Sequence, residues 1–224
     1  MLPLNSVTPD AALNGMATLI GAFVGAMLAF IFQLVIHRKQ ERQAALMCTH
    51  RMLFCLLQQI NTILLVQKDF IAPHINNPGR FLSIPAIHYF DLEKNTFDFN
   101  SFDFMLQTIE SRQIMYDLYL AQESYIEALR AVNERSRLHR EEVQPCLASS
   151  GIQNGSAVTA KDIEQALSPF LFQTIISSTE QVISSFKSAF EKLEKSKRDF
   201  RNYAVKRFKT NDFTDFDFPE KYGL

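Results

Sequence analysis

The hydrophobic pattern of the chain begins with one uninterrupted apolar run. Residues 11–36 contain no charged side chain, whereas the rest of the chain mixes polar and apolar positions at helical spacing. At ~1.5 Å per residue, a helix of this run outspans the ~30 Å hydrocarbon core of a bilayer. The pattern predicts a transmembrane helix at 11–36. The alternative is a buried helix of a water-soluble protein, but such helices rarely run this long without a charge.

The charges flanking this run predict its orientation. Residues 1–10 contain no Lys or Arg, whereas Arg38, Lys39 and Arg42 follow the run directly. Because basic residues favour the cytoplasmic side, we expect a single-pass, N-out/C-in protein of the plasma (inner) membrane with the bulk of the chain cytoplasmic. A cleavable signal peptide would carry its positive charge before a shorter apolar stretch. Residues 1–10 then form a short stub outside, and Pro9 with Asp10 marks the helix start.

Three further helices are expected, at about 38–71, 101–142 and 160–209. The first is ended by Pro73 and has an apolar stripe with helical spacing. Its residues 52–66 are apolar enough to suggest a second membrane span, but the stretch is short and holds three amides, so a buried core helix is favoured. The stripe comprises Leu46, Leu53, Leu56, Leu57, Ile60, Ile63, Leu64 and Ile71.

The helix at 160–209 has the clearest pattern. Thr159 with Asp162 predicts its start, and Ser168-Pro169 predicts either a kink or a restart with Ser168 as the N-cap. Asn100 with Asp103 similarly predicts the start of the helix at 101–142. The heptad stripe after Pro169 comprises Phe172, Ile175, Thr179, Val182, Phe186, Ala189, Leu193, Ser196, Phe200, Tyr203 and Arg207.

The predicted fold class is all-α: an N-terminal single-pass transmembrane helix continuing into a long antiparallel three-helix bundle at 37–210. The heptads do not distinguish a bundle closed within one chain from a coiled coil between chains. Up-down-up packing would place the connection at 73–100 and the tail at 211–224 together at the tip farthest from the membrane. It would also place Arg135, Arg137, His139 and Arg140 near the lipid surface.

Composition narrows the classes of function. The chain has 23 basic and 24 acidic residues, and all the basic ones lie beyond residue 37, so its cytoplasmic part is nearly neutral and no nucleic-acid partner is expected. Cys48 and Cys55 are about 10 Å apart on one helix, beyond the ~7 Å limit for a disulfide, so free thiols in a reducing compartment are expected.

Catalytic and metal-binding patterns are missing from the sequence. The glycines are not followed by the Lys-Ser/Thr pair of a phosphate-binding loop, and no hydrolase or metalloprotease motif occurs. Cys48 and His50 are two residues apart on a helix, so they point to different sides and do not share a metal. We therefore expect no enzyme, no metal and no cofactor.

Two features suggest binding to other molecules. Small residues recur every fourth position of the apolar run, a spacing that lets transmembrane helices pack closely, so a homo-oligomer or another membrane protein is the expected partner. Aromatic residues alternate with acids in the connection and in the tail, and an exposed aromatic group would bind a cytoplasmic protein. The alternative is that the tail rings cap the bundle core. The small residues are Ala17, Gly21, Gly25 and Ala29, and the aromatic candidates are Phe97, Phe99, Phe213, Phe216, Phe218 and Tyr222.

A basic stretch at 187–209 has two interpretations. It holds nine basic residues against three acids. The favoured interpretation is a solvated face neutralised by the tail acids at 212–220. The second is a contact with phosphate groups, but the expected topology puts the stretch far from the membrane and the charge is low for nucleic acid.

These patterns favour a non-enzymatic, membrane-anchored helical module that scaffolds or senses by binding a protein through its distal tip or its transmembrane helix. The alternative is a membrane-acting effector that oligomerises through the ridge at Gly21 and Gly25 and permeabilises the bilayer.

Overall fold

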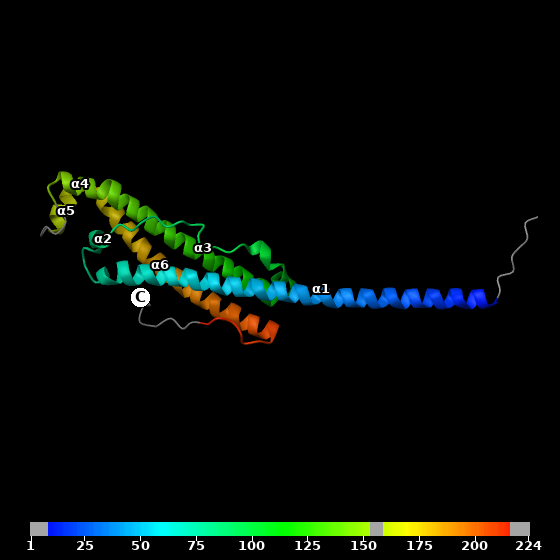
Figure 1. Cartoon of the computed structure of the whole chain (residues 1–224). Helices are drawn as coiled ribbons and strands as arrows, with labels where there is room; N and C mark the ends of the chain where they lie inside the picture. Colours follow the sequence, from blue (N-terminus) through cyan, green and yellow to red (C-terminus); the bar gives the residue numbers. More distant parts are fainter. Residues whose placement is uncertain (1–8, 153–158, 216–224) are drawn as a thin grey trace, which may run out of the picture. The chain divides into compact units, whose positions relative to one another are not determined.

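A computed structural model describes residues 9–152 and 159–215 of the chain. Within these ranges every regular element is a helix (Figure 1). The chain divides into two compact units, Met1–Met47 and Cys48–Leu224. The division falls within the long helix α1 (Pro9–Val66), later than the 36/37 boundary that the charge pattern predicts.

Unit 1 consists of the first part of α1 in the described residues. The helix begins at Pro9 with Asp10 in its first turn, as the sequence predicts. Its apolar side chains are exposed: Leu19 is 70% exposed and Phe23 is 71% exposed. Among the described residues, α1 is the one helix long and apolar enough to cross a membrane.

In unit 2 the second part of α1 is a core helix. Leu53, Leu56, Ile60 and Ile63 are fully buried, which confirms the interpretation of 52–66 as protein core. The helix loosens into a π-helical turn, η1 (Gln67–Ile71), and a 3-10 turn, η2 (Ala72–His74), that contains Pro73. Proline lacks the N–H that a continuing helix requires, so α1 stops where the sequence predicts.

The next helix begins later than expected. The connection holds a short helix, α2 (Arg80–Ser83), and a 3-10 segment, η3 (Phe99–Gln107), and α3 covers Ile109–Leu138 instead of starting at 101. Asn100 does not cap α3. Its backbone N–H donates to the side chain of Asp98, which is the N-cap of η3. Thr108 and Ser111 form the capping box of α3.

The two helices that begin after residue 158 start at the predicted caps, whereas the short helix before them was not predicted. A π-helical turn, η4 (His139–Val143), leads into α4 (Gln144–Ser149). Thr159 and Asp162 cap α5 (Ala160–Ala166), and Ser168 caps α6 (Pro169–Phe208), so the break at Pro169 is a restart. Every predicted heptad position from Ile175 to Tyr203 is buried.

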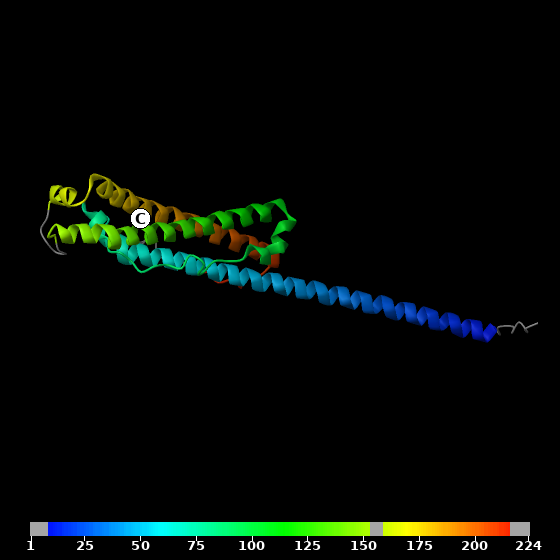
Figure 2. The ribbon, with the colours of Figure 1, turned by 90° about the horizontal axis from the view of Figure 1, so that it is seen from above.

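Helices α3 and α6 lie side by side and antiparallel (Figures 1 and 2). At one end Lys206 Nζ lies 3.2 Å from Glu110 Oε1. At the other end Arg135 Nε donates to Thr179 Oγ1 at 3.0 Å. The two helices therefore contact each other along most of the length of α3.

The path of the connection contradicts the up-down-up prediction. It runs antiparallel to α1, because Asn95 accepts from Gln59 whereas Ser101 accepts from the earlier Cys48. It also runs antiparallel to α3, because later residues of the connection meet earlier residues of that helix. The backbone N–H groups of the connection donate to side chains of α3 in the pairs Ile87–Ser136, Phe90–Asn133 and Phe97–Gln122. Since the connection opposes both, Cys48–Val66 and α3 run in the same direction.

The length of the connection explains the error. Extended chain covers ~3.3 Å per residue, so the segment between α2 and η3 can reach about 50 Å, which is enough to run back along the helices. It lies beside α3 from Ser136 to Gln122, and η3 leads from there to Thr108 at the start of α3. The segment returns along the helices instead of closing a tight turn. As a result Arg135, Arg137, His139 and Arg140 lie at the end of unit 2 opposite Cys48, so the prediction that they lie near the lipid surface loses its basis.

Candidate functional site

The aromatic residues of η3 and of the tail meet at one end of unit 2. Their ring centroids form an unbroken series of contacts between 4.8 and 6.5 Å that ends on His50, near the start of the unit. The expected meeting of the connection with the tail therefore occurs, but beside Cys48 and not at the far end. The series, here called the ring cluster, is Phe97, Phe99, Phe102, Phe104, Phe208, Phe213 and His50.

The ring cluster mainly closes the core. Phe213 is only 5% exposed, and Phe102 and Phe208 are buried as well. Phe97 and Phe99 are half-buried. This is the arrangement that the capping alternative predicts, and it leaves little of Phe213 for a partner. Phe216, Phe218 and Tyr222 lie outside the described residues.

Arg207 ties the end of α6 to this cluster. Its guanidinium lies 5.2 Å from the centroid of the Phe104 ring and 5.9 Å from that of Phe208. It also donates to Gln107 Oε1 at 3.2 Å. The heptad pattern places Arg207 in the apolar stripe, but it is exposed and acts as a cation over rings.

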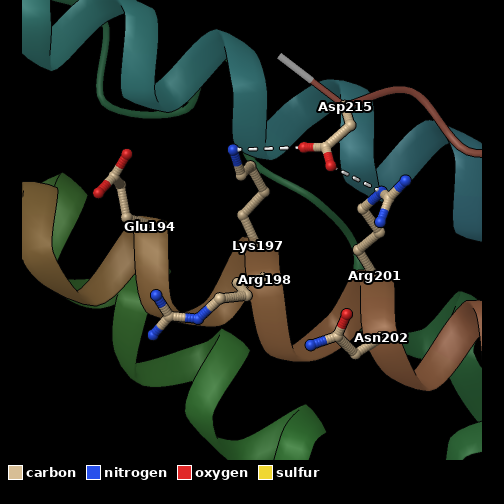
Figure 3. Close-up of a pocket in the computed structure, with 6 residues that line it drawn as sticks. All are labelled: Glu194, Lys197, Arg198, Arg201, Asn202 and Asp215. Carbon is tan, nitrogen blue, oxygen red and sulfur yellow. Dashed lines mark ion pairs between the residues drawn. The ribbon is translucent and has the colours of Figure 1, made fainter. Parts of the chain in front are cut away.

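Earlier in α6, residues 194–202 form one wall of a polar pocket of about 230 Å³. Lys197 Nζ lies 3.6 Å from Asp215 Oδ1, and Arg201 Nε lies 3.1 Å from Asp215 Oδ2. Figure 3 shows both cations reaching from α6 to the single carboxylate of the tail. The other lining residues are Glu194, Arg198 and Asn202, of which Arg198 and Asn202 point away from Asp215.

The pocket divides the basic stretch at 187–209 into two kinds of residue. Lys187, Lys192 and Lys195 are exposed, in agreement with the solvated-face interpretation. Lys197 is only 9% exposed, and Arg201 is half-buried. Because a buried ammonium group loses its hydration, its charge requires a nearby anion, and Asp215 supplies one. The predicted neutralisation by tail acids thus occurs at Asp215, while Asp217 and Glu220 lie outside the described residues.

The polar residues that hold the connection were not identified from the sequence. Asn133 binds both backbone groups of Phe90, each at 2.8 Å. Gln122 accepts from the Phe97 N–H at 2.8 Å, and Ser136 accepts from the Ile87 N–H at 3.1 Å. These side chains satisfy an extended segment that has no neighbouring strand in the described residues. Amides at buried positions of an otherwise apolar stripe were the available signal.

Arg135 is the largest fully buried side chain of the unit. Its guanidinium donates to the carbonyls of Phe81, Ile84 and Pro85 at 2.7 to 3.2 Å. Burial lowers the pKa of Arg135 to about 10. Next to it, burial followed by the charge of Arg135 lowers the pKa of His139 to about 4. All four acceptors of Arg135, these carbonyls and Thr179 Oγ1, are neutral, so the group locks the connection onto α3.

The small residues Ala17, Gly21, Gly25 and Ala29 lie along unit 1 and are exposed. A Cβ added at Gly21 or Gly25 would meet no described atom within 4 Å. The ridge is therefore open for another helix to approach closely.

No cluster of three His, Cys, Asp or Glu side chains in the described ranges 9–152 and 159–215 could hold a metal ion. Cys48, Cys55 and Cys146 are free thiols, and burial raises the pKa of the Cys55 thiol to about 11, which makes it a poor nucleophile. Comparison with protein family models, with curated proteins and with solved structures finds no match to this chain.

Proposed function

We propose that the chain is a membrane-anchored helical interaction module, with residues 11–36 embedded in lipid and unit 2 on the cytoplasmic side. One observation carries this proposal: the apolar side chains of residues 13–36 are exposed throughout the structure. A water-soluble protein rarely leaves so large an apolar surface uncovered, whereas lipid covers it at no cost. The basic residues Arg38, Lys39 and Arg42 support the cytoplasmic placement of unit 2.

The partner that the anchor favours is a second transmembrane helix, from another copy of this chain or from another membrane protein. The open ridge at Gly21 and Gly25 supports this choice, since close backbone approach requires small side chains on one face. The aromatic residues are a weaker candidate for a partner surface than the sequence suggests, because the described rings pack largely on each other.

Crosslinking in intact membranes tests the partner. In Gly21→Leu plus Gly25→Leu, the larger side chains should hold the partner helix away, and the crosslinked species should fall at least tenfold. The matched control is Ala22→Leu plus Ala26→Leu, which places the same two leucine side chains beside the ridge. An equal yield of crosslinked species from both pairs would contradict docking through the ridge.

The same open ridge also supports the second candidate function, a membrane-permeabilising effector. Overexpression distinguishes the two. An effector would dissipate the membrane potential, and Gly21→Leu plus Gly25→Leu would abolish that loss while the Ala22/Ala26 pair would not. An interaction module would leave the potential unchanged in all variants.

A further inference from the structure

The pocket at Lys197 and Arg201 contains two cations that share one acid of the tail. Asp215 contacts both, at 3.6 and 3.1 Å, and its own side chain is 40% exposed. Arg198 also lines the pocket, but it points away from Asp215 and lies 4.0 Å from Asp199, so the cations that share the carboxylate are Lys197 and Arg201. With Asp215 in place these two cations keep an excess of one positive charge over the carboxylate that they share, and without it the excess is two.

This charge count identifies the kind of ligand that would replace the tail. A carboxylate offers one negative charge, whereas a phosphate monoester carries about −1.5 to −2 at pH 7 and three acceptor oxygens. A phosphate group would balance the pocket after Asp215 leaves, and Arg201 offers the planar donor set that binds phosphate well.

We propose that the pocket formed by Lys197 and Arg201 binds a phosphate-bearing ligand, and that Asp215 is an internal competitor which the ligand displaces. Phe213, two residues earlier, is buried in the ring cluster and can stay in place while Asp215 moves. Among the described residues, displacement of Asp215 therefore leaves the ring cluster in place.

The pocket lies toward the end of unit 2 that begins at Cys48, because Asp215 follows Phe213 by two residues. Phe213 contacts His50, with ring centroids 5.0 Å apart, and His50 follows Arg38 by about a dozen residues. The chain alone therefore limits the separation of Arg38 from His50 to about 40 Å. The corrected topology thus removes the distance objection to a lipid headgroup. The lipid source rests on the proposed membrane anchorage, whereas the anion pocket itself does not.

Calorimetry on the full chain in non-ionic detergent, with inorganic phosphate as the probe, tests the pocket. If Asp215 occupies the pocket about nine-tenths of the time, its removal strengthens apparent phosphate binding about tenfold. Asp215→Asn should show this gain. The control Asp212→Asn removes a tail acid that does not line the pocket and should bind like the wild type. If Asp215→Asn binds phosphate no tighter than Asp212→Asn, the proposal is overturned.

A second pair of variants locates the anion. Arg201→Gln should weaken phosphate binding at least tenfold. Lys206→Gln should not weaken it, because Lys206 lies on the same helix as Arg201 but pairs with Glu110 of α3. Far-ultraviolet circular dichroism verifies that both variants keep their helices. Equal phosphate binding by the two variants would place the anion elsewhere and would also overturn the proposal.

Nanodiscs distinguish the two sources of phosphate. Amide exchange at residues 209–215 reports release of the tail in discs of phosphatidylcholine, with or without phosphatidic acid or with free phosphate added. Faster exchange with phosphatidic acid alone assigns the ligand to a lipid headgroup, and faster exchange with free phosphate assigns it to a soluble one. No change in either arm contradicts displacement of Asp215. A chain that fails to enter nanodiscs would refute the anchorage, while the calorimetry would still test the pocket.

Discussion

Helix α1 contains two apolar stretches, of which the first is exposed and the second is buried. Leu19 and Phe23 in the first stretch are exposed, whereas Leu56 and Ile60 in the second are fully buried. The first stretch is apolar on all sides, while the second carries polar residues such as Gln58 and Asn61 on an exposed face. An amphipathic helix can be covered by protein on one side, but a helix apolar all round requires an apolar surrounding.

The comparison shows that hydrophobicity alone does not assign a medium to a helix. Residues 52–66 pack within unit 2 because α3, α6 and the returning connection supply a core for one face. No part of the chain that the structure describes covers residues 13–36 in this way. The arrangement of apolar positions around the helix, more than their number, separates the lipid-facing from the protein-facing part.

In the protein-covered part of the chain, truncation of Phe186 should cause the largest loss of stability. This ring is fully buried in α6, and truncation to alanine leaves a cavity. We expect Phe186→Ala to lower the free energy of unfolding of unit 2 by about 3 to 5 kcal/mol, measured by urea denaturation. Phe170→Ala, at an exposed position of the same helix, should change it by less than about 0.5 kcal/mol. Equal effects would contradict the core.

The buried pair of Arg135 and His139 adds a pH dependence that the lipid-facing part does not have. The pKa of His139 is about 4 in the folded chain against an ordinary value of 6.5, so the unfolded chain binds the proton more readily. The contribution of neutral His139 to the free energy of unfolding is fully present above pH 6.5. It is lost as the pH falls through 4, and the loss is at most about 3 kcal/mol. His139→Gln should flatten this slope, whereas His88→Gln, at an exposed position, should not. The measurement is urea denaturation of the three proteins between pH 4 and 7, and an equal slope in His139→Gln and the wild type would contradict the role of His139.

The returning connection can be tested at Asn133. Asn133→Ala removes both hydrogen bonds to the Phe90 backbone and leaves two polar groups without partners. We expect a loss of about 2 kcal/mol and faster amide exchange at Phe90. Glu134→Ala changes the exposed neighbour and serves as the control. Unchanged exchange at Phe90 in Asn133→Ala would contradict the path of the connection.

The smallest effect is expected at the start of α6. Ser168 Oγ accepts from the Leu171 N–H at 3.2 Å, and Ser168→Ala removes this cap. The expected loss is about 1 kcal/mol, visible as a small decrease in the urea midpoint. Ser168→Asp keeps a capping oxygen and should retain the stability. A loss in the aspartate variant equal to that in alanine would show that the cap does not act through its oxygen.

Most helices of this chain could be predicted because their signals are local. Ser168-Pro169 and Thr159 with Asp162 act within one turn, and the heptads from Ile175 to Tyr203 repeat regularly, so each was found without knowledge of the tertiary structure. The direction of α3 could not be found this way. It depends on contacts such as Asn133 with Phe90, which are far apart in sequence and leave no periodic pattern.

The candidate site was predictable only in its parts. The alternation of Phe with Asp marked both halves of the ring cluster, but their position beside His50 depends on the direction of the connection. The sequence suggested that tail acids neutralise the basic stretch, yet nothing in the spacing singled out Lys197 and Arg201 as the pair that meets Asp215. Such a choice is made by packing, which fixes the side of α6 that is buried.

The most direct test of the central claim, that lipid covers residues 13–36, is extraction of membranes from cells that express the full chain. Alkaline carbonate should leave the chain in the membrane pellet, and replacing Phe23 and Val24 by Asp should release it, because each central charge costs about 2.5 to 3.5 kcal/mol of insertion. The same two-residue change at the exposed Phe54 and Gln58 should leave the chain in the pellet. Release of the unaltered chain into the carbonate supernatant would contradict the account.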